Sequence, residues 1–367
     1  MRKKVVIIGG GIVGASAAYA LSKQAVEVIL IDRADAGQAT DAAAGIICPW
    51  LSQRRNKAWY RLVKAGAAMY QGLIESLEAD GETDIGYKRV GALSIHTDQD
   101  KLIAMRDRAL KRREDAPEIG DIHLLNEVET KKKFPLIADG YQSVFVTGAA
   151  RVDGRKLRNA MLSAAEKHGA KIIHGDAQLH IKDSQVTGVK VNNSLISADQ
   201  VIATAGAWMD ELIKPLEKEL DVRPQKAQIL HLKYDAINTS NLPVVMPPND
   251  QYLLSFDDQR FVIGATHEDE AGYDTSVTAF GIQDILNKAL KIAPKLNDGA
   301  IIEARVGFRP MTPGFLPIIG SFPDYDGLLF ANGLGATGLT AGPYLGQELA
   351  KLALGQSTEL NLEDYQL

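Results

Sequence analysis

Glycines with the spacing G-x-G-x-x-G occupy residues 9–14 of the chain. In this pattern Gly9 permits a tight turn, Gly11 lets the backbone approach a pyrophosphate, and Gly14 lets the following helix pack closely on the preceding strand. The free N–H groups of Ile12 and Val13, at the start of that helix, would carry a partial positive charge toward the phosphates. The motif therefore predicts a dinucleotide-binding site.

The elements around these glycines form a β-α-β unit. A continuous β-branched run at residues 5–8 predicts a strand buried on both faces. Residues 12–24 predict a helix, and residues 26–31 predict a second strand that ends at Asp32. An acid at this place can bind a ribose hydroxyl, and Arg33 beside it is a further candidate contact. The alternative interpretation is a plain glycine turn next to a surface acid.

The rest of the chain alternates between helical and strand patterns. Helices are expected at residues 59–79, 101–113, 157–168, 278–292 and 343–354. Strands are expected at residues 90–96, 171–173, 178–181, 186–191, 201–203, 229–233, 251–256 and 261–264, and the chain after residue 305 is rich in glycine and proline. These patterns predict an α/β nucleotide-binding domain interrupted by a mixed-sheet domain.

Composition narrows the class of protein. The 367 residues are 46% hydrophobic and 24% charged, which is usual for a globular protein. The net charge of −5 gives a nucleic-acid partner no electrostatic support. The single cysteine, Cys48, excludes an internal disulfide and fits a reducing compartment.

The N-terminus is basic and then apolar, as in a signal peptide, but its glycine density fits a turn better than a signal helix. Because no stretch reaches about 18 apolar residues, no membrane helix is expected. A cytoplasmic protein without a metal site is predicted.

Two segments near the C-terminus carry a resemblance to a known family. Residues 307–320 read GFRPMTPGFLPIIG, similar to the pattern G-x-R-P-x-T-P-D-G-x-P-x-I-G, and a glycine-rich loop follows at residues 332–343. Residues 40–47 (TDAAAGII) and 203–208 (ATAGAW) match further family segments. The chain resembles the D-amino acid oxidase superfamily, near bacterial glycine oxidase, sarcosine oxidase and the small subunit of D-amino acid dehydrogenase.

This resemblance implies a Rossmann-type FAD-binding domain (residues 1–85, 145–212 and 305–367) with an interleaved mixed or antiparallel-sheet substrate domain (residues 86–144 and 213–304). Because no cysteine follows Cys48, non-covalent FAD is expected. Besides the first glycine motif, Asp32 and Arg33, the implied FAD contacts are Thr40, Ala43, Ala44, Gly45, Ile46, Ala177, Gln178, Ala205, Gly206, Trp208, Arg309, Gly333, Gly335, Ala336, Thr337, Gly338, Leu339 and Thr340.

The resemblance also implies three residues on the substrate side. Arg309 would bind the carboxylate of an amino acid bidentately, unless it pairs with an internal acid such as Glu303. Tyr252 would lie over the flavin, or else serve core packing. His267 would supply positive charge near the flavin, although a loop residue is the simpler interpretation. Glycine oxidase has a histidine where this chain has Asp250.

The implied activity is FAD-dependent oxidation of the CH–NH bond of a small amino acid of the glycine, sarcosine or D-amino acid type. A hydride passes to flavin N5, and water hydrolyses the imine. Oxygen or another molecule then accepts the electrons. The alternatives are an NAD(P)-dependent dehydrogenase, a flavoprotein for a larger secondary amine, and a flavoprotein without amine-oxidising activity. The sequence leaves four questions open. They are the exact substrate, whether the enzyme is an oxidase or a dehydrogenase, whether it forms a homo-oligomer, and whether His267 or Cys48 lies near the flavin.

Overall fold

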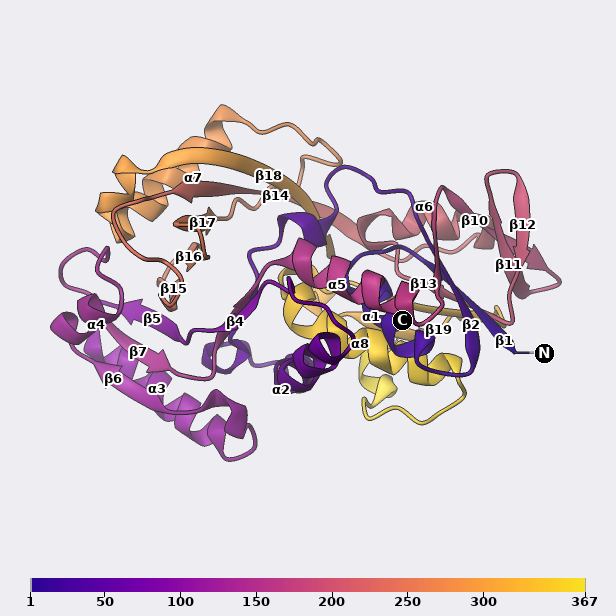
Figure 1. Cartoon of the computed structure of the whole chain (residues 1–367), viewed down its shortest axis with the longest axis horizontal. Coiled ribbons are helices and arrows are strands. Elements are labelled where there is room, and N and C mark those ends of the chain that lie inside the picture. Colours follow the sequence, from indigo (N-terminus) through magenta and orange to yellow (C-terminus); the bar gives the residue numbers. More distant parts are fainter. Residues whose placement is uncertain (1, 367) are drawn as a thin grey trace.

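The computed structural model describes residues 2–366, and a six-stranded sheet forms one half of it (Figure 1). The strand order is β19-β20-β13-β1-β2-β9, and all neighbours are parallel except β19 and β20. The bounds are β1 Lys3–Ile8, β2 Val26–Asp32, β9 Lys171–His174, β13 Gln200–Ala203, β19 Ile318–Ser321 and β20 Leu328–Asn332. The buried runs of β1 and β2 explain why these strands lack the alternation of a half-exposed sheet.

Helices cover one face of this sheet. The helix α1 (Ile12–Ser22) packs against α5 (Gly154–Lys167) and α8 (Gly338–Ala353), and α8 packs against α2 (Lys57–Ala79). Nearly all of α1 is buried, which its alanines and glycine allow. The opposite face carries a three-stranded meander and the short helix α6 (Met209–Ile213). The meander strands are β10 Ala177–Lys182, β11 Gln185–Val191 and β12 Ser194–Ser197.

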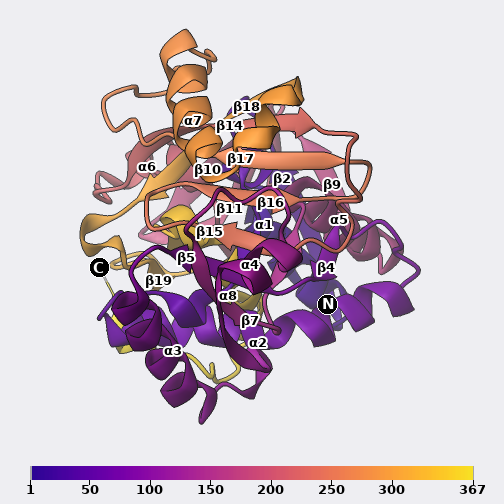
Figure 2. The same cartoon turned by 90° about the vertical axis from the view of Figure 1, so that its left-hand side faces the viewer.

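An eight-stranded sheet forms the other half, with the order β18-β14-β17-β16-β15-β5-β7-β6 (Figures 1 and 2). The strands are β5 Ala92–His96, β6 Ile122–Leu125, β7 Gln142–Val146, β14 Arg223–Lys233, β15 Val244–Met246, β16 Tyr252–Ser255, β17 Arg260–Gly264 and β18 Ala300–Met311. Its helices are α3 Gln99–Arg113, α4 Glu127–Lys133 and α7 Ala279–Ile292. A small sheet of β3 (Ile46–Ile47), β8 (Ala150–Val152) and β4 (Tyr87–Arg89) completes the strands.

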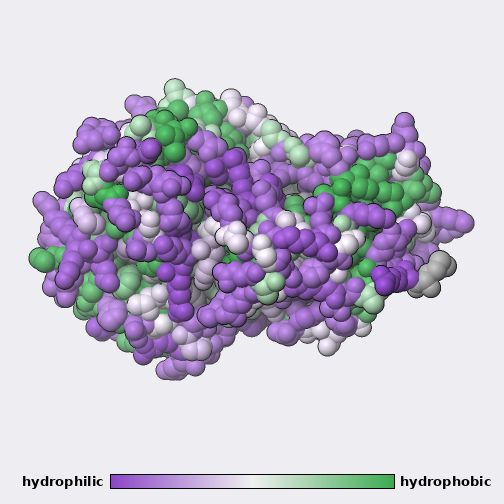
Figure 3. Space-filling model, in the orientation of Figure 1, coloured by the Kyte–Doolittle hydropathy of each residue, from purple (hydrophilic) through white to green (hydrophobic). Residues whose placement is uncertain are grey.

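The surface is largely hydrophilic, and Figure 3 shows an apolar patch over the end that carries α7 and β18. The exposed large apolar side chains of these two elements are Phe280, Ile301 and Ile302. Within residues 2–366, no helix combines the length and the apolar character that a membrane span requires.

The predicted fold class is confirmed, whereas several element bounds differ. The last helix begins at Gly338 and contains Pro343 within its first turns, where a start near residue 343 was expected. The glycine- and proline-rich stretch after residue 305 continues the twelve-residue strand β18, which the sequence did not predict. The predicted boundary at residue 305 falls inside β18, and the limits of the two domains stay a prediction.

The contact between α1 and α8 generates a test of the packing. A Cβ atom at Gly346 would lie 2.5 Å from both the Val13 carbonyl oxygen and Ser16 Cβ. Gly346→Ala should therefore lower stability by about 1–3 kcal/mol through overpacking. Gly72→Ala is the matched control, because nothing lies within 4 Å of its added methyl in α2. That change should raise stability by about 0.5–1 kcal/mol. Thermal unfolding measures both shifts, and equal shifts would contradict the close contact.

Candidate functional site

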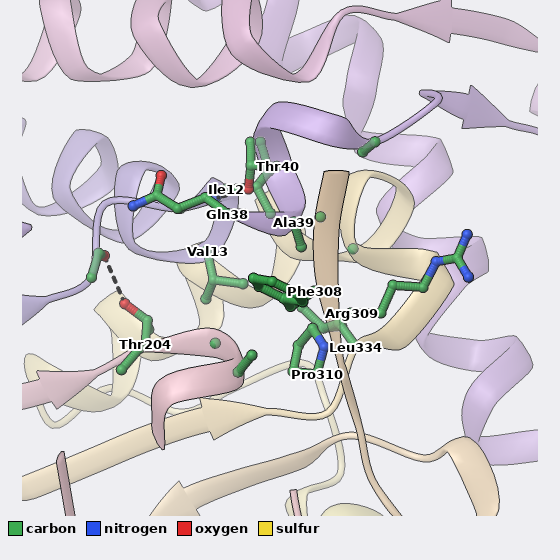
Figure 4. A pocket seen from close by; sticks show the side chains of 18 of the residues that line it. Ile12, Val13, Gln38, Ala39, Thr40, Thr204, Phe308, Arg309, Pro310 and Leu334 are labelled. Carbon is green, nitrogen blue, oxygen red and sulfur yellow. Dashed lines mark hydrogen bonds between the residues drawn. The ribbon is translucent and has the colours of Figure 1, made fainter. Parts of the chain in front are cut away.

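A cleft lies at the carboxyl ends of β1, β2 and β13 and continues under β18 and β16 of the second sheet. The cavity volume is about 430 Å³. This lies within the range of about 300–1,000 Å³ that is usual for ligand pockets. Figure 4 shows part of its wall, with Arg309 pointing away from the end that holds Thr204.

Most of the residues predicted to bind cofactor or substrate line this one cleft. They are Gly9, Gly11, Ile12, Val13, Asp32, Arg33, Thr40, Ala43, Ala44, Gly45, Ile46, Ala177, Ala205, Gly206, Trp208, Tyr252, His267, Arg309, Gly333, Gly335, Ala336, Gly338, Leu339 and Thr340. Gly14, Gln178 and Thr337 are predicted residues that do not line it. The individual contacts of all these residues with a cofactor stay a prediction.

The glycine turn at the end of β1 depends on very close backbone packing. Gly9 has a φ of +100°, and a Cβ atom there would lie 2.4 Å from the Thr204 carbonyl oxygen. A Cβ atom at Gly14 would lie 1.9 Å from the Gly9 carbonyl oxygen, so only glycine at position 14 allows α1 to pack this closely against the turn. The Thr204 hydroxyl donates to the carbonyl oxygens of Ile8 and Gly9, at 3.0 and 2.9 Å (Figure 4). These contacts join the ends of β1 and β13 at the cleft wall.

The start of α1 is open to an anion. Gly11 is its N-cap without a side-chain cap, and no acidic residue lies in the first turn. The Ile12 N–H donates to the Thr40 hydroxyl at 3.0 Å. The nearest atom to a Cβ built at Gly11 is that same hydroxyl, at 3.4 Å. Gly11 thus has no packing constraint from the protein, and its missing side chain leaves space in the cleft where the helix dipole favours phosphate.

Acidic and basic side chains ring the cleft where β2 ends. Asp32 accepts hydrogen bonds from the Gly10 N–H, from the Ala34 N–H at 2.6 Å and from Gln38 Nε2 at 2.8 Å. Arg33 forms ion pairs with Asp35 (2.9 Å), Asp176 (3.2 Å) and Glu211 (3.0 Å). The Asp32 carboxylate is therefore fixed in orientation by the turn that follows β2, and Arg33 is held by three acids.

Small residues let β18 pack closely against residues 42–46, the segment that follows β2 and its turn. Gly45 has a φ of +86°, and a Cβ atom there would lie 1.7 Å from the Val152 carbonyl oxygen. A Cβ atom at Gly307 would lie 2.7 Å from the Ala42 Cβ. Thr340 Oγ1 donates to the Ile46 carbonyl oxygen at 3.0 Å, so the start of α8 is attached to the same segment. Backbone and small side chains thus form this part of the cleft wall.

Arg309 extends into the cleft from β18 without an acidic partner. Its Nη1 donates to Gln225 Oε1 at 2.9 Å and to the Thr266 carbonyl oxygen at 3.4 Å. Among residues 2–366, no carboxylate forms an ion pair with it. Glu303, the acid expected as an alternative partner, pairs with Arg305 at 2.7 Å and Arg155 at 3.3 Å. Burial lowers the pKa of Arg309, although the guanidinium stays charged at physiological pH.

Tyr252 begins the strand β16 and faces the cleft from the second sheet. Its register partner on β17 is Gly264, where a Cβ atom would lie 3.1 Å from the Tyr252 hydroxyl. Burial raises the pKa of Tyr252 to about 12, with Arg309 opposing that shift. The phenol therefore stays protonated and can donate a hydrogen bond at any physiological pH.

His267 lies just after β17 and also lines the cleft. Its Nδ1 is 3.7 Å from the Asp250 Oδ2 atom, and Lys288 Nζ on α7 is 3.1 Å from the same oxygen. Burial lowers the pKa of His267, and the positive charge of Arg309 adds to that shift. The imidazole is therefore part of the cleft wall, and it lies next to Asp250, which forms an ion pair with Lys288.

Two partners were not found from the sequence. Gln225 supports Arg309 because the two residues are directly opposite in the β14–β18 register, and no local pattern reveals that pairing. Lys288 reaches Asp250 from a surface helix. Cys48 is buried and does not line the cleft, and burial raises the pKa of its thiol to about 12.

Comparison with known proteins places these features in context. The family model described as FAD dependent oxidoreductase (DAO) matches residues 4–352. The uncharacterized oxidoreductase YurR of Bacillus subtilis is 59% identical over 99% of this chain and 98% of its own length. Glycine oxidase of Pseudomonas putida is 27% identical over 97% of this chain and 95% of its own. The crystal structure of iminodiacetate oxidase (IdaA) from Chelativorans sp. BNC1 is 43% identical, with a TM-score of 0.96 over 99% of this chain and 98% of that one.

The open space at Gly11 can be filled by mutation to test whether FAD binds at this end of the cleft. The backbone at Gly11 is extended (φ −68°, ψ −173°), which any residue adopts. Gly11→Val should therefore fold, but its side chain should exclude the pyrophosphate and abolish FAD binding. Absorbance near 450 nm measures bound flavin, and circular dichroism checks the fold. Gly72→Val is the control on an open helix face. A folded Gly11→Val protein with normal flavin content would refute this prediction.

Proposed function

The chain belongs to the family of FAD-dependent oxidoreductases, and on that basis we propose that it oxidises the CH–NH bond of a small amino acid. The proposed substrates are of the glycine, sarcosine or D-amino acid type, with oxygen or another molecule as electron acceptor. The observation that carries the proposal is Arg309, a partly buried guanidinium in the cleft with no carboxylate partner among residues 2–366. Such a group is suited to bind the carboxylate of a substrate.

The described residues fit a bound FAD. The open start of α1 and the side-chain-free space at Gly11 suit the pyrophosphate, and Asp32 lies where an adenosine ribose would be expected. Ala43, Ala44 and Gly45 line the cleft with small residues, which would let a planar ring system lie close to the backbone. When bound, FAD supplies the hydride acceptor for the reaction. Cys48, the single cysteine of the chain, does not line the cleft, which favours non-covalent attachment.

The substrate side of the cleft would act by binding and orientation. Arg309 would hold the carboxylate, and the Tyr252 phenol would donate a second hydrogen bond to it. With the carboxylate fixed, the α-carbon would be held in one position against the cofactor. Holding two reactants in a fixed orientation in this way can raise the rate of their reaction strongly. The amine must be neutral when hydride leaves, and the imine product then reacts with water.

Two other functions have less support. An NAD(P)-dependent dehydrogenase would explain the β1–α1 turn but not the return of β18 and residues 333–340 to the same cleft. A flavoprotein for a larger amine would need a wider substrate end. The names of similar proteins favour small substrates, because glycine oxidase and iminodiacetate oxidase both act on compact amines.

The central experiment is a visible spectrum of the purified protein followed by anaerobic addition of candidate amino acids. We expect a yellow protein whose 450 nm absorbance is bleached by at least one small amino acid. A yellow protein that glycine, sarcosine, iminodiacetate and D-amino acids all leave oxidised would refute the proposed activity.

Removing the guanidinium should weaken substrate binding more than cofactor binding. Arg309→Ala should lower kcat/KM by about 10- to 100-fold, because a hydrogen-bonded charged partner of the carboxylate is lost. The flavin content should stay normal. Arg223→Ala is the control, since Arg223 lies on β14 with its side chain exposed and paired only with Asp221 in the described chain. Unchanged kinetics in Arg309→Ala would contradict the assigned role.

The raised pKa of Tyr252 gives a prediction about pH. Because the phenol stays protonated up to about pH 12, its hydrogen bond should be equally strong from pH 6 to pH 10. Tyr252→Phe should therefore lower kcat/KM by about 10-fold or more, the effect of losing one hydrogen bond to a charged group, and by the same factor throughout that range. Steady-state kinetics at several pH values measure the ratio. A ratio that falls to one between pH 8 and pH 10 would show that the phenol ionises there.

A further inference from the structure

Besides Tyr252, three ionisable side chains line the substrate end of the cleft, and two of them can be cations. Arg309 carries a permanent positive charge, His267 can gain one, and Asp250 is negative. The Asp250 carboxylate is fixed, since Lys288 Nζ lies 3.1 Å from its Oδ2 atom and Gln251 Nε2 donates to its Oδ1 atom at 3.3 Å. The cleft therefore offers two sites for anions and one for a cation.

The His267 imidazole has a free edge. Its Nδ1 faces Asp250 at 3.7 Å, and its Nε2 has no hydrogen-bond partner among residues 2–366. The residue next to it, Thr266, accepts from Arg309 through its carbonyl oxygen, so the two cationic groups belong to one wall. A carboxylate near Nε2 would complete the hydrogen bonding of this ring.

Building on the proposed function, we propose that Arg309 and His267 each bind one carboxylate of a secondary amine that carries two, such as an N-carboxymethyl amino acid. The charges of that substrate are negative, positive and negative. These charges are complementary to those of Arg309, Asp250 and His267. Asp250 is the negative member of the three and would attract the protonated amine. A substrate with a single carboxylate leaves the His267 edge unused, so the site should discriminate by the second acid.

The binding of the second carboxylate should be linked to pH. His267 is influenced by Arg309 on β18, Asp250 just before β16, Lys288 on α7, and Asp269 on its own loop. An added carboxylate favours the imidazolium and raises its pKa. Affinity for a dicarboxylate should therefore be highest at low pH, where His267 is charged, and should fall as pH rises through the titration of the ring. Affinity for a monocarboxylate should not show this change.

Non-reacting analogues test this without turnover. Isothermal titration calorimetry on the holoprotein compares oxydiacetate, which has two carboxylates, with methoxyacetate, which has one. At pH 6 oxydiacetate should bind about tenfold or more tightly, the effect of one charge-assisted hydrogen bond. His267→Met should remove most of that advantage and leave methoxyacetate binding unchanged. His123→Met is the matched control, because His123 is exposed on β6, away from the cleft.

Two results would overturn the inference. One is equal affinity of the wild-type protein for both analogues at every pH between 5 and 9. The other is a full oxydiacetate advantage in the His267→Met protein. Anaerobic addition of iminodiacetate and sarcosine to the wild-type protein separates this question from the proposed activity. Bleaching by both with equal kcat/KM refutes the second-carboxylate site alone, whereas the absence of bleaching by any amino acid refutes the proposed activity itself.

Discussion

Contact between backbone atoms at the end of β1 is the constraint on which the whole cleft depends. A Cβ atom on Gly14 would overlap the carbonyl oxygen of Gly9, and a Cβ atom on Gly9 would overlap the carbonyl oxygen of Thr204. This contact brings the start of α1 to the carboxyl end of the sheet, and the hydroxyl of Thr204 fixes the end of β13 beside it. The N-terminus of α1 then faces the cleft, and the Thr40 hydroxyl is the protein group that its Ile12 N–H contacts. The anion-binding end of the cleft is thus a consequence of steric packing and requires no charged side chain.

The pair of long strands β14 and β18 connects this end to the substrate end. Residues 305, 307 and 309 share one face of β18, and each makes a different contact. Arg305 donates to the Asp41 carbonyl oxygen at 3.2 Å, Gly307 leaves room for Ala42, and Arg309 reaches the substrate space. Because side chains of one strand repeat on the same face every second residue, a single rigid element sets the position of a carboxylate relative to the cofactor segment.

The sequence predicted the cofactor end better than the substrate end, for a physical reason. The turn at residues 9–14 and the element that follows are local, so glycine spacing and β-branched runs reveal them. The strand β18 was missed because its glycine and proline are atypical of a strand, and its stability comes from pairing with β14, about 80 residues away. Gln225 and Lys288 were missed for the same reason, since their contacts depend on register and on packing between elements. The resemblance to a family identified Arg309, whereas its surroundings needed the structure.

The surroundings of Arg309 explain how a cation is kept ready for a ligand. A partly buried guanidinium without a carboxylate is unfavourable, and the neutral oxygens of Gln225 and Thr266 compensate that cost only in part. An internal acid would stabilise the free protein more, but it would then compete with the substrate carboxylate for the same donors. Glu303 is held by Arg305 and Arg155 and is thereby kept from this position. Glu303, Arg305 and Arg155 are thus paired with each other, and the guanidinium of Arg309 would be free to bind the carboxylate of the proposed substrate.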